Sequence, residues 1–151
     1  LLSFDVFGHE EQVGQRVLIV GGGDIGVELA IHLNMLGRSS TVVEMGHYIA
    51  PKAQLTERMS YLEVLEQQKV VTLVDTTCTE ITPQGAYVES DGQRRFLEAD
   101  TVIICAGTKP LAAERDKFID TAFDVINVGD CVKASSIVHA VHTGFDAGLI
   151  L

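Results

Sequence analysis

The first half of the chain shows apolar residues in a strand–helix–strand order. Residues 16–20 are almost wholly apolar, which is typical of a strand buried on both faces of a parallel sheet. A glycine-rich stretch follows at once, and apolar residues then recur at helical spacing over 25–36 until Gly37 ends the helix. Residues 41–44 form a second strand, so the pattern predicts one strand–helix–strand unit of about 30 residues.

Further along, helical and strand-like periods alternate. Apolar residues predict a second amphipathic helix over 55–65 and a third strand over 70–74. Residues 77–98 alternate in short pieces that are interrupted by proline and glycine, which predicts a small antiparallel meander. Residues 101–105 return to the buried parallel pattern. The fold class we predict is α/β: a Rossmann-like parallel sheet with helices on both faces and a small antiparallel β-meander.

The C-terminal part has a weaker pattern. It predicts a short helix over 112–118, a last strand over 125–128 and a final helix that starts near 137. The sequence begins without methionine and ends inside the apolar pattern of that helix, so we expect the chain to be part of a longer protein.

Composition and charge narrow the class of protein. The sequence has 151 residues and a formal net charge of −10, and such an acidic chain is poorly suited to nucleic acid or to anionic membranes. No apolar run reaches the length of a transmembrane helix. Cys78, Cys105 and Cys131 form no Cys-x-x-Cys pair, so the sequence indicates neither a zinc site nor a redox dithiol. An odd number of separated cysteines fits a reducing cytoplasm. We therefore expect a cytoplasmic protein with neither a nucleic-acid nor a membrane partner.

The loop between the first strand and the first helix carries the clearest motif. It consists of Gly21-Gly22-Gly23-Asp24-Ile25-Gly26, and in this context its spacing is typical of a dinucleotide-binding turn. Gly21 permits the tight turn, Gly23 lets the backbone approach a pyrophosphate, and Gly26 lets helix and strand pack closely. The start of the helix offers N–H groups and a positive dipole end to phosphate. We expect this loop to bind a nicotinamide dinucleotide.

Two carboxylates near the loop bear on the cofactor. Glu44 ends the second strand, where an acid accepts hydrogen bonds from the adenosine ribose and repels a 2′-phosphate. We therefore expect NADH to be preferred over NADPH. Asp24 lies inside the loop, close to the expected phosphates, and we expect its side chain to cap the helix.

Two other functions share parts of this pattern. S-adenosylmethionine-dependent methyltransferases also pair a glycine loop with an acid after the second strand, but their glycines usually alternate, whereas residue 25 is isoleucine here. A non-catalytic domain that binds ADP has the same fold. His139 and His142 stand three residues apart on the last predicted helix, but no further ligand set accompanies them, so we expect no metal site.

Several stretches resemble one family of flavoproteins. Residues 20–30 resemble the NAD-domain fingerprint of oxidoreductases that bind two dinucleotides, in which an NAD domain is inserted into an FAD domain. Residues 104–110 resemble the turn where the chain leaves the NAD domain, and residues 128–131 and 136–151 resemble the Gly-Asp motif of the FAD domain and the helix after it. More narrowly, nearly the whole chain is similar to the C-terminal region of multidomain NADH:flavin oxidoreductases such as 2,4-dienoyl-CoA reductase and 2-enoate reductase.

The resemblance implies a division of the chain and roles for further residues. It implies an N-terminal segment 1–14 that leads in from an FAD domain, an NAD-binding Rossmann domain 15–108 and a C-terminal piece of the FAD domain 109–151. Glu28 is implied to lie near the nicotinamide, and Asp130 to accept a hydrogen bond from the ribitol of FAD. The implied cofactor-binding residues outside the glycine loop are Glu28, Glu44, Ala106, Gly107, Gly129 and Asp130.

The resemblance also implies what the rest of the protein supplies. The glycine loop of the FAD domain and the FMN-binding part are expected in other regions of the same polypeptide, which makes those domains the partners of this chain. The implied activity is hydride transfer from NADH to flavin, with the protein orienting the cofactors. No residue here is expected to act as a catalytic acid or base, and we expect this chain alone to be inactive.

Overall fold

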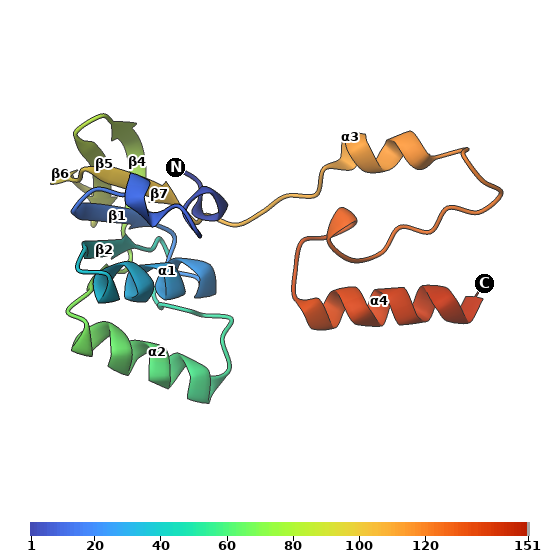
Figure 1. Ribbon diagram of the computed structural model, residues 1–151, viewed down its shortest axis with the longest axis horizontal. Helices are drawn as coiled ribbons and strands as arrows, with labels where there is room; N and C mark the ends of the chain where they lie inside the picture. The colour runs from blue at the N-terminus through green and yellow to red at the C-terminus, as the bar shows by residue number, and fades with distance from the viewer. Residues whose placement is uncertain (151) are drawn as a thin grey trace. The chain divides into compact units, whose positions relative to one another are not determined.

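The computed structural model describes residues 1–150, which divide into two compact units. The first, called unit 1 below, is Leu1–Gly107, and the second, unit 2, begins at Thr108. Unit 1 contains the β-strands and two helices, whereas unit 2 contains helices joined by irregular backbone (Figure 1).

A parallel sheet forms the centre of unit 1. Its strands lie in the order β3-β2-β1-β7, and their bounds are β1 Arg16–Val20, β2 Ser39–Val43, β3 Val71–Leu73 and β7 Thr101–Ile104. Leu18 in β1 is paired with Thr41 on one side and Val102 on the other. Because β1 lies between two neighbours, its apolar residues are buried on both faces, as the sequence predicts.

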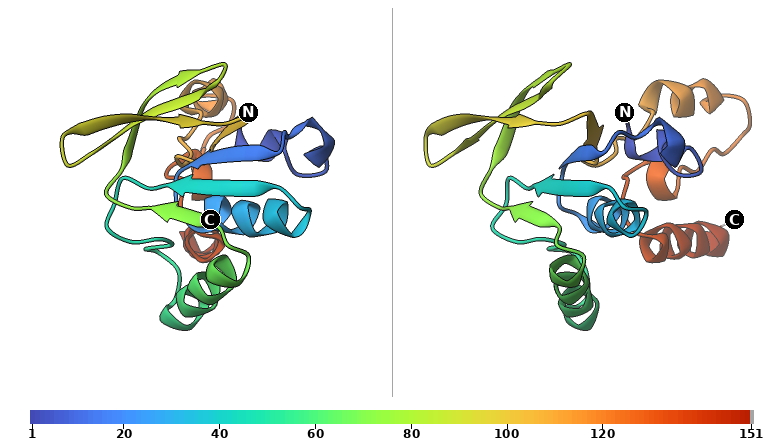
Figure 2. Two further views of the ribbon diagram at one scale, coloured as in Figure 1. Left: turned by 90° about the vertical axis from the view of Figure 1, so that its left-hand side faces the viewer. Right: turned by 60° about the vertical axis from the view of Figure 1, so that its left-hand side comes forward.

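Helices cover one face of this sheet. They are α1 Asp24–Met35 and α2 Leu55–Gln67, and α1 lies between the sheet and α2 (Figures 1 and 2). Alternate residues of the strands, such as Ile19 and Ile103, pack with Leu29 and Leu33 of α1 in one buried cluster. The predicted strand–helix–strand unit is therefore confirmed.

The antiparallel meander covers the opposite face. Its strands are β4 Thr77–Thr82, β5 Gly85–Ser90 and β6 Gln93–Glu98. Ala86 and Val88 of β5 pack against Leu18 and Val43 of the parallel sheet in a second buried cluster. The predicted α/β class, with a Rossmann-like sheet and a meander, is confirmed. On this face of unit 1, however, the meander lies where the sequence predicts a helix. The apolar side chains of the meander supply the cover that the sheet needs.

The N-terminal residues pack against the same sheet. Short 3-10 turns span Ser3–Asp5 and Glu10–Gln12, and Val6 and Val13 are part of the helix-side core. The backbone N–H of Ile104 donates to the carbonyl of Leu1. Residues 1–14 therefore belong to unit 1 in the structure.

Unit 2 contains α3 Ala112–Arg115, 3-10 turns at Asp116–Phe118 and Gly129–Cys131, and α4 Ile137–Ile150. The predicted helices near 112–118 and from 137 are thus confirmed. The predicted strand over 125–128 is wrong, because these residues have irregular backbone. A strand needs a neighbour to bond its N–H and C=O groups, and unit 2, as described from residue 108 to 150, contains none. No helix within residues 1–150 is long and apolar enough to cross a membrane.

Candidate functional site

The glycine loop lies at the carboxyl-terminal edge of the parallel sheet. Ligands of open α/β sheets bind at this edge, where the strands end and the helices begin. The N–H of Gly21 donates to the carbonyl of Val43 at 2.8 Å, and the N–H of Ala50 donates to the carbonyl of Gly22 at 2.7 Å. The ends of β1 and β2 are therefore tied together through the loop.

Two glycines of the loop are required by steric contact. Gly21 has a φ of +114°, and a Cβ there would lie 2.5 Å from the carbonyl oxygen of Cys105. A Cβ on Gly26 would lie 2.0 Å from the carbonyl oxygen of Gly21. Neither contact is tolerable for backbone atoms, so the tight turn and the close helix–strand packing predicted for these positions are present in the structure.

Gly23 is different, because it borders open space. A Cβ on Gly23 would meet no atom within 4 Å. Gly23 is also the N-cap of α1, and within residues 1–150 no side chain caps this helix. The N–H groups of the first turn are thus not taken by a capping side chain, and they carry the positive end of the helix dipole. This geometry suits a bound phosphate.

Glu44 is held in place by the loop itself. Its Oε2 accepts a hydrogen bond from the N–H of Gly22 at 2.7 Å, and its Oε1 accepts one from the N–H of Gly46 at 2.8 Å. A Cβ on Gly22 would come within 2.8 Å of the Glu44 Cβ. The carboxylate is therefore fixed beside the loop at the end of β2, and each oxygen keeps a lone pair for a ligand.

Asp24 does not cap the helix, contrary to the expectation from the sequence. Gly23 occupies the N-cap position, and Asp24 is the first residue inside α1, from which its side chain makes no capping hydrogen bond. Its Oδ1 is buried without a partner among the described residues. Burial raises the pKa of Asp24, and the charges of Glu57 and Glu28 raise it further.

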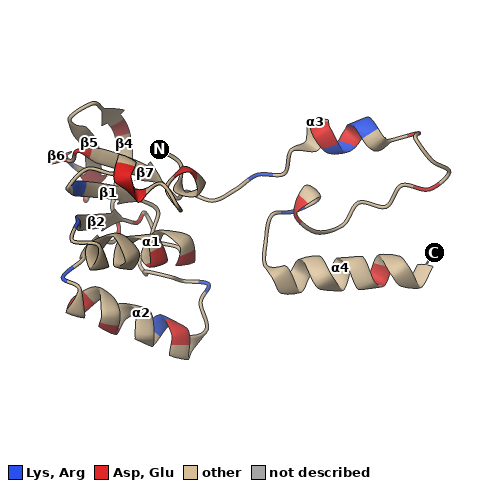
Figure 3. Cartoon of the chain, in the orientation of Figure 1, with Lys and Arg blue, Asp and Glu red and all other residues tan. Residues whose placement is uncertain are grey.

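The next residues of the helix point in different directions. Ile25 is exposed, whereas Gly26 is buried. Glu28 is exposed in the second turn of α1, and its Oε1 accepts a hydrogen bond from the hydroxyl of Tyr61 at 2.6 Å. Figure 3 shows acidic residues at the neighbouring right-hand ends of α1 and α2.

Ala106 and Gly107 follow β7 next to the loop. The N–H of Cys105 donates to the carbonyl of Val20 at 2.8 Å, and the backbone nitrogen of Ala106 lies 3.2 Å from the place a Gly21 Cβ would take. Gly107 has a φ of +86°. The structure thus brings Ala106 to the glycine loop.

Gly129 and Asp130 lie in unit 2 and form their own small arrangement. The N–H of Gly129 donates to Oγ1 of Thr143 in α4 at 3.0 Å, and Oδ1 of Asp130 accepts from the N–H of Ser135 at 3.2 Å. A Cβ on Gly129 would lie 3.3 Å from the Ala140 Cβ. The predicted Gly-Asp motif is therefore a turn packed on the start of α4.

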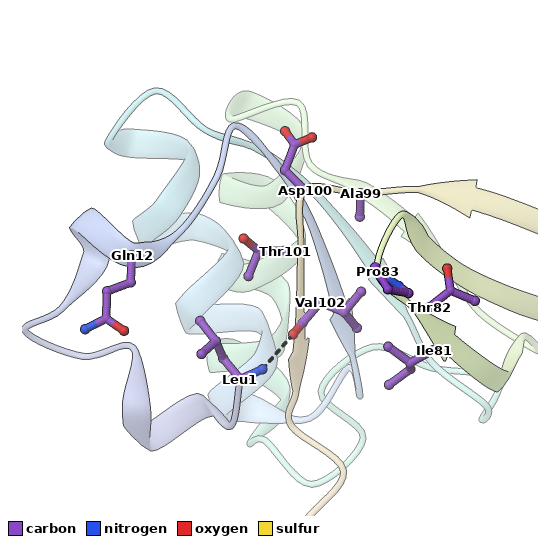
Figure 4. Close-up of a pocket in the computed structure, with 9 residues that line it drawn as sticks. All are labelled: Leu1, Gln12, Ile81, Thr82, Pro83, Ala99, Asp100, Thr101 and Val102. Atoms are coloured by element: carbon purple, nitrogen blue, oxygen red, sulfur yellow. Dashed lines mark hydrogen bonds between the residues drawn. The ribbon is translucent and has the colours of Figure 1, made fainter.

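One pocket in unit 1 lies away from the loop. It has a volume of about 340 Å³ and is lined by residues of the N-terminal segment, the meander and the start of β7 (Figure 4). Thr101 in this lining is paired with Val17, at the opposite end of the strands from Gly21. We therefore assign no cofactor to this pocket.

The thiol nearest the loop is not activated. Burial raises the pKa of Cys105 to about 11, opposed by a side-chain hydrogen bond with Ser3, so the thiol stays protonated near neutral pH. Among the described residues, no group of His, Cys, Asp and Glu side chains is arranged to hold a metal ion.

The fold and this loop define an α/β dinucleotide-binding unit. Residues 5–144 match the family described as pyridine nucleotide-disulphide oxidoreductase, and the chain belongs to that family. Membership implies the use of FAD and NAD(P) by an oxidoreductase. The family gives no support to the methyltransferase alternative.

Known relatives are much longer than this chain. Bilirubin reductase from Mediterraneibacter gnavus is 33% identical over 150 residues, which cover 99% of this chain and 23% of that protein. NADH oxidase from Thermoanaerobacter brockii is 31% identical over 133 residues, or 87% of this chain and 20% of that protein. A solved structure of 2-naphthoyl-CoA reductase with 2-naphthoyl-CoA shares the fold, with a TM-score of 0.87 and 24% identity over 98% of this chain and 23% of that one. The resemblance to part of a multidomain flavin oxidoreductase is confirmed.

Two contacts of the site were not foreseen from the sequence. Tyr61 is 33 positions from Glu28 along the chain, and α2 shows no motif that marks this residue. Gly46 donates an N–H to Glu44 from the turn after β2, and a glycine after a strand indicates at most a turn and not this contact.

Proposed function

We propose that this chain is the NADH-binding part of a flavin-dependent oxidoreductase. The observation that carries the proposal is the placement of Glu44, whose carboxylate is bonded to the N–H of Gly22 within the glycine loop. An acid fixed there is positioned to accept hydrogen bonds from the adenosine ribose of a dinucleotide.

The residues fit the remaining parts of such a ligand. Open space at Gly23 and the uncapped start of α1 suit a pyrophosphate. Asp24 is the exception, since a carboxylate at this point opposes an anion. Burial raises the pKa of Asp24, and the charges of Glu57 and Glu28 raise it further.

The preference for NADH over NADPH rests on charge. A 2′-phosphate would be placed against the Glu44 carboxylate, and the turn that follows β2, Met45-Gly46-His47, contains no arginine to pair with it. His47 is instead paired with Asp75 at 2.5 Å. A relative named NADH oxidase is in keeping with this preference.

Other parts of the same polypeptide are proposed to complete the enzyme. Residues 109–151 are assigned to the FAD domain, with Gly129 and Asp130 facing FAD. Residues 1–14 are the segment that leads in from that FAD domain to an NAD domain of residues 15–108, and they pack against the sheet of unit 1. Hydride transfer is the chemistry that bound nicotinamide and flavin supply. The role of this chain is to bind NADH and orient it, with Ala106 and Gly107 bordering the same site.

Titration of the protein with NADH, NADPH and ADP tests the proposal. We expect NADH to bind more tightly than NADPH. Because Glu44→Gln removes the charge, it should weaken NADH binding by roughly tenfold and narrow the gap to NADPH. Glu89→Gln, an exposed position on the meander, is the matched control and should change neither affinity.

The same titration separates the proposal from its rival. A non-catalytic nucleotide-binding domain would bind ADP as tightly as NADH, because nothing in it would recognise the nicotinamide half. Equal affinities for NADH and NADPH in the unmodified protein would contradict the role given to Glu44.

A further inference from the structure

Tyr61 connects α2 to the exposed acid of α1. Its hydroxyl donates to Oε1 of Glu28 at 2.6 Å and lies 3.4 Å from Oε1 of Glu57. The Tyr61 ring packs against the helix-side core of unit 1, so the hydroxyl is carried on a rigid base. Glu28 itself is exposed, and no other residue in 1–150 holds its carboxylate.

Other acidic residues surround Glu28, so the hydrogen bond from Tyr61 matters for where its carboxylate lies. Asp24 lies one helical turn earlier on the same face, and Glu57 lies across from it at the start of α2. Like charges at this spacing repel each other, and the raised pKa of Asp24 records the repulsion from Glu57 and Glu28 after the larger effect of burial. Without the bond from Tyr61, the Glu28 carboxylate would turn toward solvent, away from the other acids.

We propose that Tyr61 is a positioning residue, which holds the carboxylate of Glu28 so that it accepts a hydrogen bond from the nicotinamide half of the dinucleotide. This rests on the proposed function and on the resemblance of residues 20–30 to an NAD-domain fingerprint, which implies that Glu28 lies near that half of the ligand. Side chains of a helix lean in general toward its N-terminus, and the glycine loop adjoins that end of α1.

The pair has a defined chemical character. Tyr61 has a single hydroxyl proton, which it gives to Glu28, and its pKa is raised chiefly by that hydrogen bond. A carboxylate has no proton to donate, and the hydroxyl proton of Tyr61 is directed at Glu28, so the pair offers only acceptors to a ligand. Their partner must be a donor, and the nicotinamide half provides the carboxamide NH₂ and the hydroxyls of its ribose.

The role of Tyr61 is tested by measuring how tightly ligands of decreasing length bind to the full-length protein. Binding of NADH, ADP-ribose and ADP is measured for the unmodified protein and for Tyr61→Phe, which keeps the ring and removes the hydroxyl. Tyr61→Phe should weaken NADH binding by roughly three- to tenfold, the effect of one ordinary hydrogen bond, and leave ADP binding unchanged. A parallel loss for ADP-ribose identifies a ribose hydroxyl as the donor, and no loss identifies the carboxamide.

A purely structural role gives a different result. If Tyr61 only ties α2 to α1, Tyr61→Phe lowers the melting temperature and weakens all the ligands alike, which would overturn the assignment. Tyr87→Phe is the matched control, because Tyr87 packs on Phe96 in the meander; it should alter no affinity.

A double-mutant cycle shows whether Tyr61 acts through Glu28. In a Glu28→Ala background, Tyr61→Phe should cause no further loss of NADH affinity, since the carboxylate it positions is gone. Additive losses would overturn the proposal. If the unmodified protein binds ADP as tightly as NADH, the proposed function itself is refuted. If the unmodified protein prefers NADH to ADP and Tyr61→Phe leaves that preference unchanged, only the role of Tyr61 is refuted.

Discussion

The two units of the chain differ in where their large apolar side chains lie. In unit 1 the central residues Ile19, Leu29 and Leu33 are each 0% exposed. In unit 2, α4 contains no buried residue among those described, and Ile137 and Phe145 are 84% and 66% exposed. Unit 1 therefore has a core of its own, whereas the apolar surface of α4 is not covered by the described residues.

This difference means that the two units obtain their stability in different ways. Burial of apolar surface is the main favourable term in folding, and unit 1 obtains it from its own sheet, helices and meander. Unit 2 has apolar residues at the spacing of a buried helix but gains little burial from the described chain. The proposed assignment of residues 109–151 to an FAD domain would explain why those positions are apolar.

The largest expected effect comes from truncating one apolar side chain in each unit. Leu33→Ala should lower the free energy of unfolding by about 2–5 kcal/mol, because it opens a cavity in a filled core. Phe145→Ala in this chain should change it by less than about 0.5 kcal/mol, as at other exposed positions. Urea unfolding of the 151-residue chain measures both.

The same two substitutions sharpen the comparison when they are made in the longer polypeptide proposed above. If α4 is covered there, Phe145→Ala should cost about as much as Leu33→Ala. An equally small effect in both settings would show that α4 stays exposed, and it would contradict the assignment of 109–151 to a folded FAD domain.

Glycine-to-alanine substitutions should change stability by an intermediate amount, and the change should be a loss in unit 1 and a gain in unit 2. Gly26→Ala should destabilise unit 1 by about 1–3 kcal/mol and abolish NADH binding, since its Cβ would lie 2.0 Å from the Gly21 carbonyl oxygen. Gly144→Ala meets no atom within 4 Å, so it should stabilise α4 by up to about 1 kcal/mol. Thermal unfolding and NADH titration of the two variants test this, and a stable Gly26→Ala variant that still binds NADH would contradict the packing described here.

The smallest expected effect concerns Asp24 and pH. Because its pKa is raised above the ordinary value of 3.8, the folded state binds the proton more readily, and stability falls as pH rises through that range. Asp24→Asn should therefore stabilise the protein at pH 7 by about 0.2–0.5 kcal/mol, the size of one like-charge pair on a helix. The gain in stability should vanish when the pH falls below the ordinary pKa of an aspartate. Asp146→Asn on α4 is the charge-matched control. A gain that persists in acid would show that the charge of Asp24 is not its cause.

Much of unit 1 could be predicted because its signals are local. The apolar run of β1, the glycines and the helical period of α1 lie within residues 16–35, so each element follows from neighbouring residues. The strand expected over 125–128 failed because a strand is stabilised by a partner, which a local pattern does not supply. The cover on the second face of the sheet also depends on packing between distant segments.

The candidate site shows the same limit. The glycine loop and Glu44 follow from spacing, but the two hydrogen bonds that fix the Glu44 carboxylate depend on the turn geometry around Gly22 and Gly46. Asp24 was expected to cap α1. The helix begins at Asp24 itself, one position earlier than that expectation requires, so Gly23 is the N-cap. The bond between Tyr61 and Glu28 joins two helices and leaves no trace in the sequence pattern.

The double attachment of Glu44 has a consequence for the evolution of cofactor choice. Its carboxylate accepts a hydrogen bond from Gly22 in the glycine loop, and in the proposed complex it would also meet the adenosine ribose. A single substitution that accommodates NADPH would therefore also loosen the loop that every dinucleotide needs. A change of cofactor at Glu44 therefore needs a second support for the loop, because the proposed ribose contact and the bond to Gly22 depend on one carboxylate.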